Sequence, residues 1–198
     1  MEIKPILFNT EMVRAILDGR KTCTRRLVRF LPGENPQWTG YIRDGLMLYN
    51  GRNETCIMKA PYQAGDILYV RETFIQIAAH TFWYKADGKS WMLKDLRWKP
   101  SIHMPKEAAR IWLKVTNVRV ERLQDITEDG AEAEGAIDNR GFIHSPENEY
   151  DRIYTAREHF IEIWDRTIKK SDLDIYGWDA NPWVRVIEFE RCGKPKEV

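Results

Sequence analysis

The hydrophobic positions at the start of the chain predict a short strand followed by a helix. Residues 5–8 form an apolar run, which is typical of a short strand. Val13 and Ile16 then recur at helical spacing, so they share one face of a helix. Asn9 or Thr10 stands just before this pattern and suits an N-cap, because its side-chain oxygen can accept a hydrogen bond from a free backbone amide. We therefore expect the helix to begin there.

Most of the remaining apolar positions predict strands. After Gly19, a residue suited to end the helix, the chain from 22 to 28 can run extended. Within the longest predicted strand the apolar phase changes after Val115, which indicates a bulge or a bend. The further strands are expected over residues 67–75, 82–85, 111–121 and 183–189.

Two more helices are expected in the second half of the chain. Thr127 is a candidate N-cap for a short helix that Gly135 ends. Residues 153–168 are amphipathic, with Phe160 and Trp164 one turn apart on the apolar face. Strands and helices do not alternate regularly, which argues against a doubly wound parallel sheet. The pattern predicts an α+β fold with a small mixed β-barrel flanked by helices.

Composition favours one globular domain over residues 1–198. Of the 198 residues, 43% are hydrophobic and 31% are charged, so the chain is neither disordered nor membrane-like. No apolar run approaches the roughly 20 residues that a membrane-spanning helix needs. The first residues also lack the apolar core of a signal peptide. A cytoplasmic location and no membrane partner are therefore expected.

Cysteine and histidine usage gives no sign of a metal site. The three cysteines are widely spaced and odd in number, which favours reduced thiols over a disulfide framework. The four histidines show no metal-ligand spacing with one another or with the cysteines. We expect neither a metal nor another cofactor. Cys23 lies among cations and is either a reactive thiol or a buried structural cysteine.

The net charge of +1 hides an uneven distribution. Residues 1–30 hold seven bases against three acids and residues 94–119 seven against two, whereas residues 121–175 are acidic. A basic face attracts polyanions such as RNA, and an ordinary solvated surface is the alternative. The acidic stretch also leaves open a role in contacts with a protein.

Cations and hydroxyls crowd into residues 19–26, directly after the first helix. If this segment is extended, Thr24 and Arg26 point to the same side, because alternate residues share a face of a strand. Lys21 precedes them in a turn and can reach either side. The three residues are candidates for a polar cleft, although cations after a helix also complement its dipole.

Glu72 is the candidate acid of the same cleft. In the predicted strand 67–75 it shares a face with apolar residues, so its carboxylate is expected to point inward. A buried carboxylate needs a cationic or hydrogen-bonding partner, and Lys21 and Arg26 are the natural candidates. A structural ion pair or an exposed glutamate is the alternative.

Three segments, in order and spacing, resemble the motifs of ASCH domains, a superfamily with a PUA-like barrel fold. Gly19-x-Lys21-x-x-Thr24-x-Arg26 is similar to their G-x-K-x-x-T-x-R signature. Residues 65–72 resemble their G-D-x-L-x-V-x-E strand, and residues 125–135 resemble their I-T-E-E-D-A-x-x-E-G helix.

The resemblance extends over about two-thirds of the chain and leaves residues 31–64 and 136–152 as insertions. Gly130 is a departure that weakens the third motif's helix by about 1 kcal/mol. Segments at 98–105 and 181–183 are similar to phage or prophage members of the superfamily.

The resemblance implies a cleft that accepts a nucleobase or an RNA element. Some superfamily members are amidohydrolases that remove the acyl group from N4-acetylcytidine, and some relatives are reported as ribonucleases. By motif position, Thr24 would be the nucleophile, Lys21 its base and Glu72 the partner that handles the proton. A base is needed because a threonine hydroxyl is a poor nucleophile until its proton is removed. Arg26 would bind the substrate or steady the glutamate.

Further substrate contacts are expected from cations around the cleft. Arg25 follows Thr24 directly, and Lys99 and His103 lie in a basic loop that contains two prolines. The expected partner is RNA or a modified nucleoside. Two functions stay open: hydrolysis of an acylamide on a modified cytidine, or RNA binding without catalysis by a module of phage or prophage origin.

Overall fold

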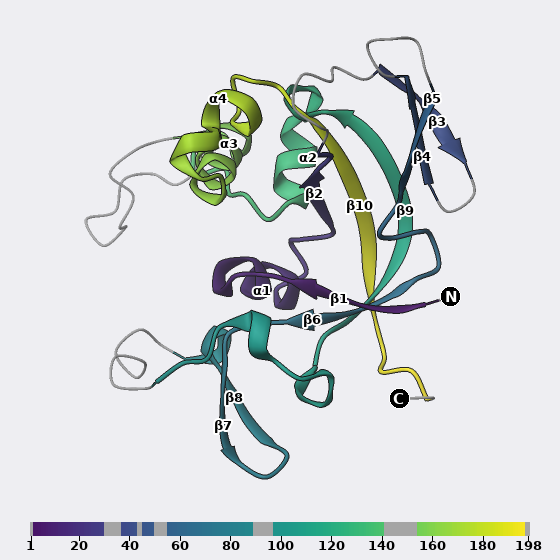
Figure 1. The fold of residues 1–198 in the computed structure, drawn as a ribbon. Helices are drawn as coiled ribbons and strands as arrows, with labels where there is room; N and C mark the ends of the chain where they lie inside the picture. Colours follow the sequence, from purple (N-terminus) through teal and green to yellow (C-terminus); the bar gives the residue numbers. More distant parts are fainter. Residues whose placement is uncertain are drawn as a thin grey trace.

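A five-stranded sheet organises the fold, with strand order β1-β6-β9-β10-β2 (Figure 1). The computed structural model describes residues 2–29, 37–42, 45–49, 55–88, 97–140 and 154–196. The strands of the sheet are β1 (Ile3–Leu7), β2 (Cys23–Leu27), β6 (Ile67–Arg71), β9 (Trp112–Arg122) and β10 (Trp183–Cys192). β1 and β6 run parallel, and the other pairs are antiparallel. The predicted strands at 5–8, 22–28, 111–121 and 183–189 are confirmed.

The long strands β9 and β10 carry the bend that the apolar phase predicts. Their register shifts so that Glu188 faces Asn117 while Phe189 faces Val115. Thr116 is therefore the extra residue of a bulge, and a bulge increases strand twist and curvature. Both strands arch across the molecule in Figure 1.

The sheet is open, and its two edges come close together. β1 and β2 are the edge strands, and no pairing between them joins the edges within the described ranges. Arg26 of β2 nevertheless donates a hydrogen bond from Nη2 to the carbonyl of Leu7 in β1, at 2.8 Å. The structure thus has the expected α+β character, with a strongly curled sheet in place of a barrel closed by strand pairing.

The helices begin where their capping residues predict. Asn9 accepts a hydrogen bond from the Met12 amide at 2.8 Å, and Thr127 accepts one from the Gly130 amide at 3.0 Å. Thr155 forms a capping box with the residue three positions later. The helices are α1 (Thr10–Leu17), α2 (Glu128–Ala133), α3 (Ala156–Thr167) and α4 (Leu173–Tyr176). None in the described part of the chain is long and apolar enough to cross a membrane.

The single strand expected over residues 67–75 is wrong, because the chain divides there into two strands of different sheets. β6 ends at Arg71, and β7 (Phe74–Ala78) pairs instead with β8 (Thr81–Tyr84) in a separate hairpin. Glu72 lies in the break, with its amide on the sulfur of Met104 at 3.1 Å. The predicted apolar face itself is confirmed, since Leu68, Val70, Glu72 and Phe74 are all buried.

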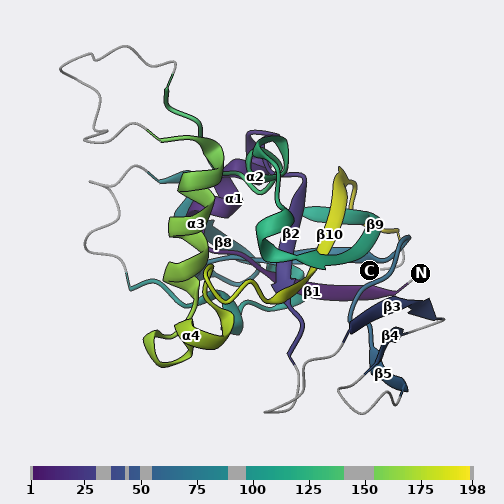
Figure 2. The same ribbon diagram turned by 90° about the horizontal axis from the view of Figure 1, so that it is seen from above.

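A second small sheet lies within the expected insertion at 31–64. It contains β3 (Gln37–Ile42), β4 (Gly45–Tyr49) and β5 (Thr55–Lys59) in antiparallel order. In both views it lies on the opposite side of the main sheet from α3 and α4 (Figure 2). The turns expected near 44–45 and 50–51 fall mostly outside the described residues, as does most of the expected insertion at 136–152.

Two apolar clusters pack on the sheet. One joins Ile16 of α1 to Leu68, Leu113 and Ile187 of three strands. The other joins α3 to α2, β2 and β10, through Phe160 and Trp164 among others. Short 3-10 turns connect the elements: η1 (Lys85–Asp87), η3 (Ser101–His103), η4 (Lys106–Ala108), η5 (Leu123–Asp125) and η6 (Lys170–Asp172). Three buried charged residues, Lys21, Arg25 and Glu134, line a space that residues of both clusters also line.

Candidate functional site

A cavity of about 200 Å³ lies between the two edge strands of the main sheet, with α3 as a further wall. Its polar lining consists of Asn9, Lys21, Thr24, Arg25, Arg26, Glu134 and Thr167. Its apolar and aromatic lining includes Leu7, Phe8, Met12, Phe160, Ile163 and Trp164. Apolar walls around a few converging polar groups are typical of a small-molecule site.

Lys21 is buried, with 3% of its surface exposed, and its partner is Glu134. Its Nζ donates to Oε2 of Glu134 at 2.6 Å and to the backbone carbonyl of the same residue at 2.7 Å. The ammonium nitrogen also lies 5.4 Å from the centre of the Phe8 ring. Glu134 thus holds Lys21 in the wall of the cavity by both its side chain and its backbone.

Gly135 makes this close approach possible. Its backbone has φ of +93°, in the region that glycine adopts readily, and it ends α2. A Cβ at this position would lie 2.9 Å from the Cβ of Ala15 and 3.4 Å from that of Lys21. A larger residue would therefore push the end of α2, and with it Glu134, away from the start of β2.

Thr24 and Arg26 share one face of β2, as the alternation predicts. Thr24 is only 4% exposed, and no protein group in the described part of the chain hydrogen-bonds its hydroxyl. Arg26 lies 5.3 Å from the centre of the Phe8 ring. Burial lowers the pKa of Arg26 from its ordinary value, which Glu134 and Tyr62 partly oppose. The cavity thus joins an unengaged hydroxyl to a half-buried guanidinium.

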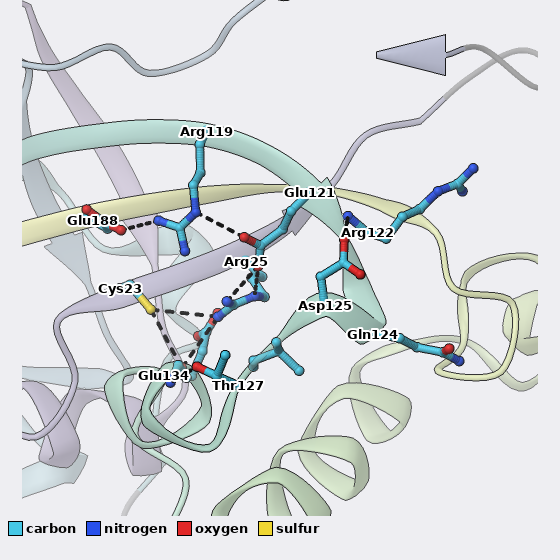
Figure 3. Close-up of polar contacts among 12 residues, drawn as sticks. Cys23, Arg25, Arg119, Glu121, Arg122, Gln124, Asp125, Thr127, Glu134 and Glu188 are labelled. Carbon is cyan, nitrogen blue, oxygen red and sulfur yellow. Dashed lines mark hydrogen bonds and ion pairs between the residues drawn. The ribbon is translucent and has the colours of Figure 1, made fainter.

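Arg25 belongs to the opposite face of β2 but also reaches the cavity wall. Nε and Nη2 donate to Oε1 of Glu121 at 3.0 and 2.7 Å, and Nη1 points to Oε1 of Glu134 at 3.4 Å (Figure 3). The guanidinium also lies 5.9 Å from the centre of the Phe160 ring. Its donors are therefore engaged by protein carboxylates, and direct substrate binding by Arg25 stays a prediction.

Glu72 is buried as expected, but its expected pairing with Lys21 or Arg26 is wrong. Its two carboxylate oxygens accept from Nε and Nη2 of Arg110, at 2.9 and 3.0 Å. Arg110 lies just before β9, and Glu72 lies just after the end of β6. Glu72 is not among the described residues that line the cavity.

The two predicted contacts from the basic loop lie apart from the cavity lining as described. Lys99 is exposed, and its backbone pairs with that of Phe74 at 2.8 and 3.2 Å. His103 is exposed at the end of η3. Neither side chain lines the cavity. Each could contact only a part of a substrate that extends out of the cavity.

Glu134 is the functional candidate that the sequence reasoning missed. It belongs to the third motif, directly before Gly135, and this motif position was the sequence signal that could have identified it. Its place in an acidic stretch favoured a solvated residue, whereas the structure buries it beside Lys21 and Arg25. The structure therefore brings together Lys21, Thr24, Arg25 and Arg26 with Glu134 in place of Glu72.

The arrangement has the parts that acyl transfer requires. Thr24 supplies a hydroxyl, Lys21 and Glu134 supply a hydrogen-bonded pair that can pass a proton, and Arg26 supplies charge for a developing oxyanion. No group of three or more potential metal ligands is present in the described ranges.

Cys23 is expected to resist alkylation in the folded protein. It is 4% exposed, and burial raises the pKa of its thiol to about 12, with Glu134 adding to the rise and Lys21 and Arg25 opposing it. Because only the thiolate reacts, iodoacetamide at pH 8 should modify Cys23 about three orders of magnitude more slowly than a free cysteine. Peptide mass spectrometry over time measures this rate, and labelling of Cys23 at the rate of free cysteine would contradict burial.

A comparison of the chain with family models, curated proteins and solved structures finds no match.

Proposed function

We propose that the chain is an ASCH-type domain that binds a modified cytidine in the cavity and hydrolyses its N4-acyl amide. The observation that carries the proposal is the convergence of Lys21, Thr24, Arg26 and Glu134 on one cavity. In this proposal Glu134 takes the role that motif position gave to Glu72. The ASCH resemblance supplies the substrate class and the roles of Thr24 and Lys21, and the contact of Glu134 with Lys21 supports Glu134 as the partner that handles the proton.

Thr24 acts as the nucleophile. Its Oγ attacks the amide carbonyl carbon, while its proton passes to Nζ of Lys21 in the neutral amine form. Proton exchange along the 2.6 Å contact with Glu134 provides that form and leaves a carboxylic acid. The acid then returns the proton to the N4 amine as the C–N bond breaks, giving cytidine and a threonine ester. A second proton exchange along the same contact frees Lys21 as the base for a water molecule, which attacks the ester. Glu134, now the acid, returns a proton to Oγ of Thr24 as the carboxylic acid product leaves.

The shape of the cavity suits a flat heterocycle with a small acyl group. Aromatic side chains on two sides, Phe8 and Phe160, can pack on the base. Arg26 can donate to the carbonyl oxygen of the base or to the oxyanion of the tetrahedral intermediate. A volume of about 200 Å³ holds a base and an acetyl group but leaves the ribose near the opening.

The finer fold assignment is part of the same proposal. The parallel pair β1–β6, the bulge at Thr116 and the approach of β1 to β2 through Arg26 support a PUA-like barrel that is incompletely closed. We also keep the cytoplasm as the proposed location, because free nucleosides and RNA meet the protein there.

Thr24→Val should abolish acetate release from N4-acetylcytidine, because valine keeps the shape of the side chain but removes the nucleophilic oxygen. The expected loss in kcat is at least about 10³-fold. Chromatographic detection of cytidine together with an acetate assay measures the reaction.

A matched control is Thr116→Val, an exposed threonine at the bulge of β9. Full activity in Thr24→Val would exclude the nucleophile assignment. A wild-type chain that fails to hydrolyse N4-acetylcytidine but binds RNA in a strongly salt-dependent manner would favour the non-catalytic RNA-binding module.

A further inference from the structure

A chain of charged side chains with alternating sign links the cavity to the far side of β2 (Figure 3). Arg119 contacts Glu188 through Nη1 and donates from Nε to Oε2 of Glu121 at 3.0 Å. The other oxygen of Glu121, Oε1, accepts hydrogen bonds from Arg25. In order from the outside, the members are Glu188, Arg119, Glu121, Arg25, Glu134 and Lys21.

Burial increases along this chain toward the cavity. The side chains of Arg119 and Glu188 are 42% and 38% exposed, whereas that of Arg25 is 2% exposed. Charge interactions strengthen as water is excluded, so the inner contacts have the larger effect on geometry. The inner charged residues, Arg25, Glu134 and Lys21, are therefore the ones that can fix the geometry of the site.

The carboxylate of Glu134 is divided between two cations. Oε2 accepts from Lys21 at 2.6 Å, and Oε1 faces Arg25 at 3.4 Å. Two nitrogens of Arg25, Nε and Nη2, donate to one oxygen of Glu121, which fixes the plane of the guanidinium. The orientation of Glu134 toward Lys21 thus depends on a residue, Glu121, that does not line the cavity.

Arg25 also lies beside open space, although its side chain is only 2% exposed and Nη1 points to the Gly130 carbonyl at 3.5 Å. A second cavity, of about 290 Å³, lies on the other side of β2 and is lined by Thr22, Cys23, Arg25, Arg119 and Glu188 among others. A guanidinium beside empty space keeps its position through its charged partners. Removing the charge of Glu121 would leave Arg25 with only its longer contacts, to Gly130 and Glu134 at 3.5 and 3.4 Å, which hold it less firmly against a turn toward that space.

We propose that Arg25 and Glu121 are positioning residues, which keep Glu134 aligned with Lys21 for proton transfer. This inference rests on the proposed function but concerns residues that no fixed position of the ASCH motifs specifies. Neither residue touches the reacting atoms in this role. Arg25 acts on Glu134, and Glu121 acts on Arg25.

The test is Glu121→Gln, with Glu190→Gln as the matched control. Glu190 lies on β10 and pairs at 3.6 Å with Lys114 on the surface, outside the charged chain. With N4-acetylcytidine, Glu121→Gln should lower kcat about tenfold or more and leave KM within about twofold, because misalignment affects the proton transfer rather than binding. Glu190→Gln should change neither constant.

A second readout separates positioning from a loss of folded protein. The ¹H–¹³C signal of the Lys21 Cε methylene, assigned with Lys21→Ala, reports the surroundings of Nζ and needs no turnover. It should shift in Glu121→Gln and stay in place in Glu190→Gln. All assays are run well below the thermal midpoints of the variants, so that a merely destabilised variant is still folded.

The outcomes distinguish the two proposals. A wild-type chain without turnover would overturn the proposed hydrolysis, and the Lys21 signal would still test the coupling. Unchanged kcat together with an unchanged Lys21 signal in Glu121→Gln would overturn the positioning role. Changes of similar size in kcat and KM of Glu121→Gln, without a shift of the Lys21 signal, would also overturn it, because they indicate a structural effect alone.

Discussion

Glu134→Gln is expected to lower kcat for N4-acetylcytidine by about 10²- to 10⁴-fold, the usual contribution of a general acid or base. Glutamine keeps the size of the side chain and a carbonyl oxygen for Lys21. It cannot pass a proton between Lys21 and the leaving amine. Steady-state kinetics measure the loss, and circular dichroism checks that the variant is folded.

Glu72→Gln is the comparison that decides between the two glutamates. Glu72 pairs with Arg110 and does not line the described cavity, so its amide variant should stay within about threefold of wild-type kcat. If Glu72→Gln loses activity while Glu134→Gln keeps it, the assignment of Glu134 is wrong, and the role given by motif position is restored.

Arg110→Met is expected to destabilise the fold by about 3 kcal/mol at pH 7. Glu72 has 1% of its side chain exposed, and Arg110 is its hydrogen-bonded cation. Removing one partner of a buried pair leaves an uncompensated charge, which costs roughly 3–5 kcal/mol. We expect the lower end because Arg110 is 27% exposed. Denaturant unfolding measures the change in the free energy of unfolding.

The loss should depend on pH with a definite sign. Burial raises the pKa of Glu72 above its ordinary 4.5, and Arg110 opposes the rise. Above pH 4.5 the folded chain therefore holds this proton more tightly than the unfolded chain does, so the group's contribution to stability falls as pH increases through the folded pKa. Without Arg110 the pKa rises further. The deficit of Arg110→Met should thus be larger at pH 7 than at pH 5.

A double variant provides the control for this prediction. Arg110→Met combined with Glu72→Met replaces both charges by apolar groups, and such replacements of buried pairs are often neutral. It should recover most of the lost stability and remove the difference between pH 5 and pH 7. Equal stability of Arg110→Met and wild type at pH 7 would show that water, rather than Arg110, satisfies Glu72.

Local chemistry made much of the fold predictable from the sequence. The cap at Asn9, the left-handed Gly19 and Gly135, and the bulge at Thr116 each depend on residues close along the chain. The division after Arg71 was not predictable in this way. Apart from Glu72, the apolar alternation continues through residues 67–75, and β6 ends where Glu72 contacts the distant residues Met104 and Arg110.

The sequence predicted those features of the site that depend on alternation within a single strand. Alternation along β2 placed Thr24 and Arg26 together, and burial of Glu72 followed from its apolar neighbours. The acid that meets Lys21 lies 113 positions away, and periodicity carries no information on such pairs. A choice between two motif glutamates therefore required the fold.

The alternation of β2 also makes the length of this segment matter more than most of its side chains. Cys23 and Arg25 lie on the face behind Thr24 and Arg26. An insertion or deletion of a single residue between Lys21 and Thr24 would exchange the two sets, since every side chain would change face. The hydroxyl would then enter the rear cavity. At the front it would be replaced by the thiol of Cys23 after an insertion before Cys23, and by the guanidinium of Arg25 after a deletion. A point substitution in this segment alters the reactivity of one side chain. A one-residue shift of the register of β2 would remove Thr24 and Arg26 together from the cavity.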